Sequence, residues 1–184
     1  MRRGVTIIEL LMVMIILGTV LAIAVPRIDV NAYRADAAAR GVRGVLQIAQ
    51  RSAITRQSNI IVTFDSSNKR ISVLEDINDN GTADVGERLT NKPLEEKVQF
   101  IAPTMGKVAG GSTSAFLVGS SLQYVASLPR IIMRRDGSSS SDVEIYLTVR
   151  SNITKEFRAI TVDPAIGKTE LYRYSGTAWK RMTQ

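Results

Sequence analysis

The chain has 184 residues, enough for one ordinary domain plus an N-terminal segment, and its 24 Lys and Arg against 17 Asp and Glu give a net charge of +7. It contains no cysteine and no histidine. These absences exclude disulfides, thiolate metal sites, cysteine nucleophiles, Ser-His-Asp triads and histidine-bound zinc, so the sequence supports no ordinary hydrolytic enzyme. The mild positive charge is weak evidence for an anionic partner and is more often typical of a solvated surface.

Residues 5–25 form an apolar segment that carries a single charge, Glu9. As a helix, this segment is roughly 30 Å long, which matches the hydrocarbon core of a bilayer. Two arginines precede it, which predicts a cytoplasmic start, and Pro26 is expected to end or kink the helix. A secretory signal peptide cleaved after Ala24 and a plain membrane anchor both fit this pattern, but neither explains an acid inside the segment.

A third interpretation accounts for the acid. The basic leader of residues 1–4, the sequence TIIEL at residues 6–10 and the long apolar helix resemble type IV pilins and the pilin-like proteins of type II secretion systems. In that family, a membrane peptidase cuts after the glycine of the leader and methylates the new amine. The resemblance implies cleavage between Gly4 and Val5, and it departs from the family in one respect, since phenylalanine usually stands where this chain has Val5.

The resemblance also implies a role for Glu9 in filament assembly. After cleavage, the amine of Val5 lies in apolar surroundings, where a positive amine and a negative carboxylate each need a partner. Glu9 can approach the amine of its own helix, about one turn away. In a filament it can instead meet Val5 of a neighbouring subunit, which fixes the axial register.

The rest of the chain predicts a helix followed by strands. Residues 27–56 repeat apolar or small side chains at the spacing of one helix face. Strands are predicted at residues 59–64, 70–74, 97–102, 130–134, 143–149, 157–162 and 169–174. The serine run at residues 138–141 predicts a mobile loop. The expected fold class is α+β, with a long N-terminal helix, its first half transmembrane, packed on an antiparallel sheet of about seven short strands.

Two further stretches resemble the GspH/FimT branch of pilin-like proteins. They are QRSAITR at residues 50–56, and DINDNG at residues 76–81 followed by Asp84 and Glu87. Members of this branch are minor subunits of type II secretion pseudopili or of type IV pili, and some pilus members take part in DNA uptake. The resemblance implies a structural and assembly-initiating role rather than catalysis.

The acidic stretch of residues 76–87 also fits the calcium-loop pattern D-x-[DN]-x-[DN]-G-x5-E. A hard cation takes several oxygen ligands, and the glycine permits the sharp turn. The flanking residues look like strands rather than EF-hand helices, so an Asx-rich hairpin turn without a metal is the alternative. The candidate Ca2+ ligands are Asp76, Asn78, Asn80, Thr82, Asp84 and Glu87.

The C-terminus places an aromatic side chain among basic ones. Trp179 is followed by Lys180 and Arg181, and Arg173 lies shortly before them. An aromatic ring beside cations is suited to stacking on bases and neutralising phosphates of DNA. The alternative is that Trp179 belongs to the last strand and that Lys180 and Arg181 are simply solvated.

Together, these observations predict a prepilin leader at residues 1–4, a transmembrane and filament-core helix at residues 5–26 and a periplasmic pilin-like domain at residues 27–184. The expected protein is a minor pilin or pseudopilin of the bacterial inner membrane, whose partners are prepilin peptidase/N-methyltransferase and other pilin subunits. The alternative function is a DNA-binding minor pilin for natural transformation. No cofactor is expected apart from Ca2+ in the acidic stretch. The sequence leaves a secretion pseudopilus and a type IV pilus open.

Overall fold

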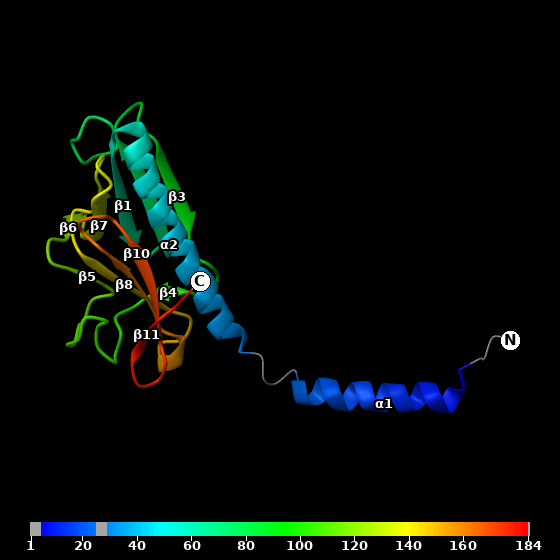
Figure 1. Ribbon diagram of the computed structural model, residues 1–184. Helices are drawn as coiled ribbons and strands as arrows, with labels where there is room; N and C mark the ends of the chain where they lie inside the picture. Colours follow the sequence, from blue (N-terminus) through cyan, green and yellow to red (C-terminus); the bar gives the residue numbers. More distant parts are fainter. Residues whose placement is uncertain (1–4, 25–28, 184) are drawn as a thin grey trace. The chain divides into compact units, whose positions relative to one another are not determined.

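Two units make up the computed structural model, which describes residues 5–24 and 29–183 (Figure 1). The first unit ends at Val30 and contains helix α1 (Ile7–Ala24). The second begins at Asn31 and contains all the strands and nearly all of helix α2 (Val30–Arg56). Pro26, which the sequence predicts to end or kink the apolar helix, lies outside the described residues.

Helix α1 is apolar on every side. From Ile7 to Leu21, every large apolar side chain is more than half exposed, and Glu9 is the single charge in the helix. Surface helices of globular domains instead combine one apolar stripe with a polar face. Within residues 5–24 and 29–183, no helix meets both the length and the hydropathy required of a membrane span.

Helix α2 has one buried face. Its buried residues recur at helical spacing and are mostly alanines, so the sheets can approach the helix closely: Ala35, Ala38, Ala39, Val42, Val45, Leu46, Ala49 and Ala53. Gly41 and Gly44 lie off this face, and no atom comes within 4 Å of the position that a Cβ would take at either. Their small size therefore brings no other part of the described chain close to α2.

The strands form two antiparallel sheets. Their bounds are β1 (Asn59–Asp65), β2 (Arg70–Asp76), β3 (Leu89–Pro93), β4 (Gln99–Phe100), β5 (Leu117–Gly119), β6 (Gln123–Val125), β7 (Leu128–Met133), β8 (Val143–Thr148), β9 (Arg158–Val162), β10 (Thr169–Tyr174) and β11 (Trp179–Arg181), with a 3-10 helix η2 (Thr154–Glu156) before β9. Sheet A has the order β3-β2-β1-β7-β6. Sheet B has the order β11-β10-β9-β8-β4, and β5 also pairs with β8.

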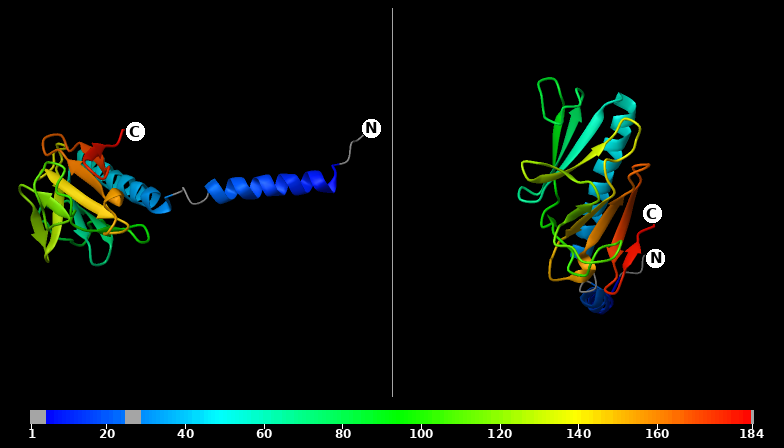
Figure 2. Two further views of the ribbon diagram at one scale, coloured as in Figure 1. Left: turned by 90° about the horizontal axis from the view of Figure 1, so that it is seen from below. Right: turned by 90° about the vertical axis from the view of Figure 1, so that its left-hand side faces the viewer.

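A single apolar core joins α2 to both sheets, which lie on the same side of the helix (Figures 1 and 2). Alternate residues of the strands point into this core, as the pleat requires. Phe64 of β1 meets Phe100 of β4 edge to face at 5.7 Å between ring centroids, and Phe100 stacks on Phe116 at 5.3 Å. These rings connect the two sheets beneath the helix.

A buried ion pair also fixes α2 to sheet B. The Arg158 side chain on β9 is 0% exposed, and its guanidinium donates to the carboxylate of Asp36 on α2. It also donates to the carbonyls of Lys155 at 2.8 Å, Phe157 at 3.0 Å and Ala32 at 3.3 Å. Burial lowers the pKa of Arg158 and Asp36 opposes that shift, so the charge is retained through its partners.

The α+β class is confirmed, with more strands than predicted. The described chain has eleven strands in two sheets rather than about seven in one. The loop predicted at residues 138–141 is irregular as expected, but it is packed into the domain, with Ser139 1% and Ser141 3% exposed. Ser139 forms a bridge with Met133, and its hydroxyl donates to the carbonyl of Ser141 at 2.9 Å.

Candidate functional site

The N-terminal candidates lie at the start of α1. Gly4 lies outside the described residues, and Val5 is 70% exposed. Thr6 precedes the helix, and the backbone N–H of Glu9 donates to the Thr6 carbonyl at 3.1 Å and to the Thr6 hydroxyl at 3.3 Å. Thr6 therefore acts as the N-cap and Glu9 occupies the third helical position, which is the T-x-x-E spacing of a capping box.

This geometry gives Glu9 a local role that the sequence reasoning missed. A carboxylate in the first turn is stabilised by the positive end of the helix dipole. The spacing from Thr6 to Glu9 was the signal that could have revealed it. Within the described residues, the Glu9 side chain is exposed and forms no ion pair, so its carboxylate is available to a partner outside this chain.

The acidic stretch is a turn that leads out of β2. Asp76 is 3% exposed, and its carboxylate accepts the backbone N–H groups of Asn80 at 3.1 Å and Gly81 at 3.0 Å. Glu87 accepts the N–H groups of Ile77 at 2.9 Å and Asp84 at 3.1 Å. Both carboxylates thus serve as internal caps for the backbone of the turn.

The amide side chains complete this network. Asn78 donates to the Asp84 carboxylate at 2.8 Å, and Asn80 also donates to it. These bonds hold the pKa of Asp84 below its usual value. The Asn80 oxygen accepts the backbone N–H and the hydroxyl of Thr82 at 2.8 and 2.9 Å. The six candidate Ca2+ ligands therefore lie in one turn, and their oxygens form hydrogen bonds within the turn itself.

The turn is also tied to the strands of sheet A. Arg130 of β7 donates to the Gly81 carbonyl at 2.8 Å, and Arg135 donates to Asp79 at 3.0 Å. Gly81 has φ = 74°, a left-handed conformation that suits glycine. Within residues 5–24 and 29–183, no three His, Cys, Asp or Glu side chains converge as metal ligands. This arrangement favours the Asx-rich turn, and Ca2+ binding stays a prediction.

The C-terminal candidates are divided between the two faces of sheet B. β11 pairs with β10 so that Lys180 lies opposite Arg173, Trp179 opposite Tyr174 and Arg181 opposite Tyr172. Successive side chains of a strand point to opposite faces. Arg173 and Lys180 therefore share one face, while Trp179 and Arg181 lie on the other.

On its own face, Trp179 is held by packing. Its ring lies 5.6 Å from Tyr146 and 5.3 Å from Tyr174, and its indole N–H donates to the Gly106 carbonyl at 3.1 Å. Arg181 pairs with Glu170 at 2.8 Å. The structure thus places Trp179 in the last strand, as the alternative to the DNA hypothesis expects.

The sequence reasoning missed the residues that hold a loop on this face. The Glu144 carboxylate on β8 accepts the backbone N–H of Val108 at 3.1 Å and of Ala109 at 2.9 Å. Tyr146 also donates its hydroxyl to Glu144, and burial followed by this contact raises the Tyr146 pKa. Because side chains alternate between the faces of a strand, the sequence of β8 was sufficient to place Glu144 and Tyr146 on the same face. It could not show that the loop at Val108 and Ala109 would be their partner.

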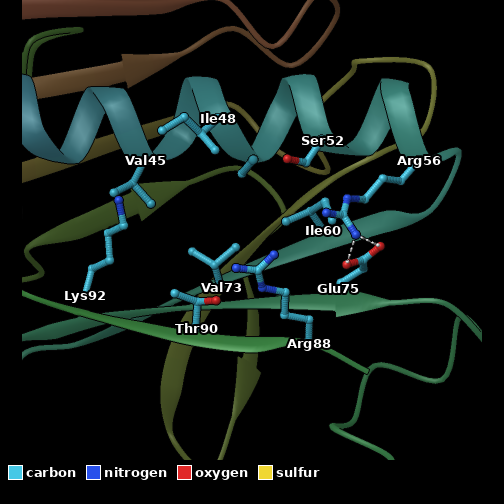
Figure 3. Close-up of a pocket in the computed structure, with 11 residues that line it drawn as sticks. Val45, Ile48, Ser52, Arg56, Ile60, Val73, Glu75, Arg88, Thr90 and Lys92 are labelled. Atoms are coloured by element: carbon cyan, nitrogen blue, oxygen red, sulfur yellow. Dashed lines mark hydrogen bonds and ion pairs between the residues drawn. The ribbon is translucent and has the colours of Figure 1, made fainter. Parts of the chain in front are cut away.

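A groove between α2 and sheet A was also missed. It is lined by Val45, Ile48, Ala49, Ser52 and Arg56 of α2, by Ile60 of β1, and by Val73, Glu75, Arg88, Thr90 and Lys92 in and beside β2 and β3 (Figure 3). Its volume is about 260 Å³. The spacing of Arg88, Thr90 and Lys92 could have indicated that they lie on the same face of a strand and form one wall of the groove. The other wall is α2, which is distant in sequence and could not be paired with this strand from the sequence.

Known structures resemble this fold. The minor pseudopilin EpsH from the type II secretion system of Vibrio cholerae matches at a TM-score of 0.51 and 14% identity, over 76% of this chain and 97% of that chain. A second EpsH structure matches at 0.50 and 16%, over 75% and 92%. The type IV minor pilin FimU of Pseudomonas aeruginosa matches at 0.45 and 12%, over 79% and 91%.

Sequence comparisons give no corresponding match. No protein-family model matches the chain, and no curated protein does. The identities to EpsH are low, so the likeness concerns the fold. It covers nearly the whole of the EpsH chain, and the N-terminal leader and Glu9 had already indicated the same class of protein. The chain therefore has an α+β pilin-like fold, similar to that of EpsH.

Proposed function

We propose that the protein is a minor pilin or pseudopilin, a structural subunit that helps to start assembly of a type II secretion pseudopilus or a type IV pilus. The observation that carries this proposal is the joint presence of a pilin-like domain and an all-round apolar helix with one acid in its first turn. A domain alone has no need of such a helix. A plain anchor has no need of Glu9.

The apolar helix would be covered by lipid before assembly and by neighbouring helices afterwards. The helix has no polar face, so lipid or neighbouring helices would each remove its exposed apolar side chains from water. The arginines at positions 2 and 3 favour a cytoplasmic start. In this proposal, residues 5–26 are held in the inner membrane and the domain is periplasmic.

Cleavage between Gly4 and Val5 would supply the partner that Glu9 lacks within the described chain. The new amine stands about 6 Å along the helix axis from Glu9, given a rise of 1.5 Å per residue. In a filament, Glu9 would pair instead with the amine of the next subunit. Both charges are then compensated in apolar surroundings.

Mass spectrometry of the N-terminus of protein from native membranes tests the processing step. The expected result is a chain that starts at N-methylated Val5. A chain that starts at Val25 would show a secretory signal peptide instead and would overturn the proposal. An intact leader in a host with active prepilin peptidase would overturn it as well.

Three variants separate the charge of Glu9 from its place in the capping box. Glu9→Gln keeps a residue that can cap a helix but removes the charge, and Glu9→Val removes both properties. Thr6→Ala removes only the cap. If charge pairing fixes the register, both Glu9 variants insert in the membrane but enter filaments at least about tenfold less, and Thr6→Ala assembles. Normal assembly of Glu9→Gln would contradict the pairing account.

The alternative of a DNA-binding minor pilin has less support from the geometry. Its four candidate residues lie on two faces of sheet B, and Trp179 is engaged by Tyr146, Tyr174 and Gly106. Arg173 and Lys180 still form an exposed basic pair. DNA uptake therefore remains a prediction, and catalysis is not part of the proposed role.

A further inference from the structure

The groove described above continues along α2. A second hollow of about 210 Å³ is lined by Ala38, Gly41, Val42, Val45, Ile71, Lys92, Pro93, Leu94 and Glu95. It shares Val45 and Lys92 with the first hollow. Together they follow α2 from Ala38 to Arg56, which is roughly 27 Å along the helix axis. We call this feature the α2–β3 groove.

The floor of the α2–β3 groove is apolar, and its rim carries the cations Arg56, Arg88 and Lys92 together with the carboxylates Glu75 and Glu95. Val45, Ala49 and Val73 line the floor, and Ile48 is 57% exposed at its edge. The groove therefore offers side-chain pockets that the domain itself does not fill.

Two cations at the rim lack carboxylate partners. At one end, Arg56 is held by Glu75 through bonds of 3.0 and 2.8 Å. Arg88 and Lys92, in contrast, form no ion pair within the described residues. Figure 3 shows both side chains extending from the β3 side toward α2. Separate acidic groups in the groove would meet the two cations.

The strand that borders the groove has an open edge. β3 stands at the end of sheet A and, among the described strands, pairs only with β2. Its backbone from Leu89 to Lys92 can accept another strand, whereas Pro93 has no N–H to donate. Strand addition supplies backbone hydrogen bonds, while pockets for alternate side chains give specificity.

We propose that the α2–β3 groove binds an extended segment of another polypeptide that carries both apolar and acidic residues on one face. The segment adds to the free edge of β3 and directs this face into the groove, where its apolar side chains fill the pockets and its carboxylates pair with Arg88 and Lys92. Charge favours this occupant over a second copy, because residues 29–183 of each copy carry the same positive excess of 21 Lys and Arg over 16 Asp and Glu. The inference concerns the domain alone and does not depend on filament assembly.

A binding titration with the full chain in detergent micelles tests the proposal. The probe is a fluorescein-labelled peptide of eight residues with the sequence VTETVTET, which places valine and glutamate on one face of a strand and threonine on the other, and the matched probe replaces glutamate with lysine. We expect the acidic peptide to raise the anisotropy and the basic peptide to have no effect. Hydrogen exchange of the backbone amides at residues 89–92 should slow only with the acidic peptide.

Charge reversal at the rim provides the matched variant. Arg88→Glu with Lys92→Glu should weaken the acidic peptide by at least about tenfold and permit the basic one. Arg134→Glu with Lys180→Glu makes the same charge change away from the groove and should leave the affinity unchanged. Thermal unfolding of both double variants shows that they are folded.

Several results would overturn the proposal. One is equal binding of the two peptides or of neither, and another is unchanged affinity in the rim variant. A dimer seen by sedimentation and lost only in the rim variant would assign the groove to a second copy. Binding of a labelled single-stranded oligonucleotide that is lost in the rim variant, without peptide binding, would assign it to nucleic acid.

Discussion

Removing Asp36 should destabilise the domain strongly. The Asp36→Ala variant leaves the guanidinium of Arg158 buried at 0% exposure, with backbone carbonyls as its remaining partners. Breaking one side of a buried ion pair costs about 3–5 kcal/mol. Because the Asp36 side chain is itself 19% exposed, water can partly replace it, and we expect the lower end, about 3 kcal/mol.

Urea unfolding of the purified chain, followed by far-UV circular dichroism, measures this loss. For a domain of this size, about 3 kcal/mol corresponds to a fall in Tm of roughly 6–12 °C. Glu96→Ala removes an exposed carboxylate and should change the stability by less than about 0.5 kcal/mol. Asp36→Ala with Arg158→Met removes both charges and should recover much of the loss. A cost below about 1 kcal/mol for Asp36→Ala would refute the reasoning.

Three further predictions concern the turns and the C-terminus. Millimolar Ca2+ should leave the Tm unchanged if the turn at residues 76–87 satisfies its own oxygens, whereas a rise would show metal binding. Hydrogen bonds from Asn68 hold the pKa of Asp65 below its usual value, so ionised Asp65 stabilises the folded domain fully at neutral pH and this stabilisation is lost as the pH falls below about 4. In unfolding measured at several pH values, Asp65→Ala should therefore lose less stability on acidification than the unmodified chain. In gel shifts at low salt, Lys180→Ala should weaken any DNA binding, and Trp179 fluorescence should not respond to DNA.

Long strands with strong patterns could be predicted, and short edge strands could not. The predictions at residues 59–64, 143–149 and 169–174 lie within a residue or two of the observed strands. In contrast, β5 and β6 have three residues each and carry no period that a sequence can show. Their pairing with β8 and β7 depends on tertiary contacts. The split into two sheets could not be predicted for the same reason.

Burial in the serine run at residues 138–141 has a similar origin. Serine, glycine and asparagine are typical of loops because they form local hydrogen bonds, and composition alone suggests a mobile segment. Here the same hydroxyls satisfy the backbone where the segment bridges to Met133. Composition indicated an irregular conformation, but whether such a segment is exposed depends on the elements that surround it.

The C-terminal candidates show a limit that sequence reasoning could have avoided. Lys180 lies between Trp179 and Arg181, so in a strand it must point to the face opposite both. The three side chains could form one basic and aromatic surface only if the segment were a loop. In a strand, Trp179 and Lys180 point to opposite faces, so they cannot stack on a base and contact a phosphate on the same surface.

Glu9 differs from all of these cases. Its position as an acid in an apolar segment is visible in the sequence, whereas its partner is not among the described residues. The unfavourable transfer of a carboxylate into apolar surroundings depends on its immediate neighbours, so one sequence is sufficient to identify it. The cap in the described chain is supplied by the Thr6 hydroxyl to the backbone N–H of Glu9, and any residue other than proline at position 9 would keep that bond. A residue that needed only to cap α1 would not have to be charged. In the proposed function, the charge meets a cationic partner supplied either by processing of this chain or by a second subunit, and Glu9→Gln tests this because it removes the charge and leaves the Thr6 cap in place.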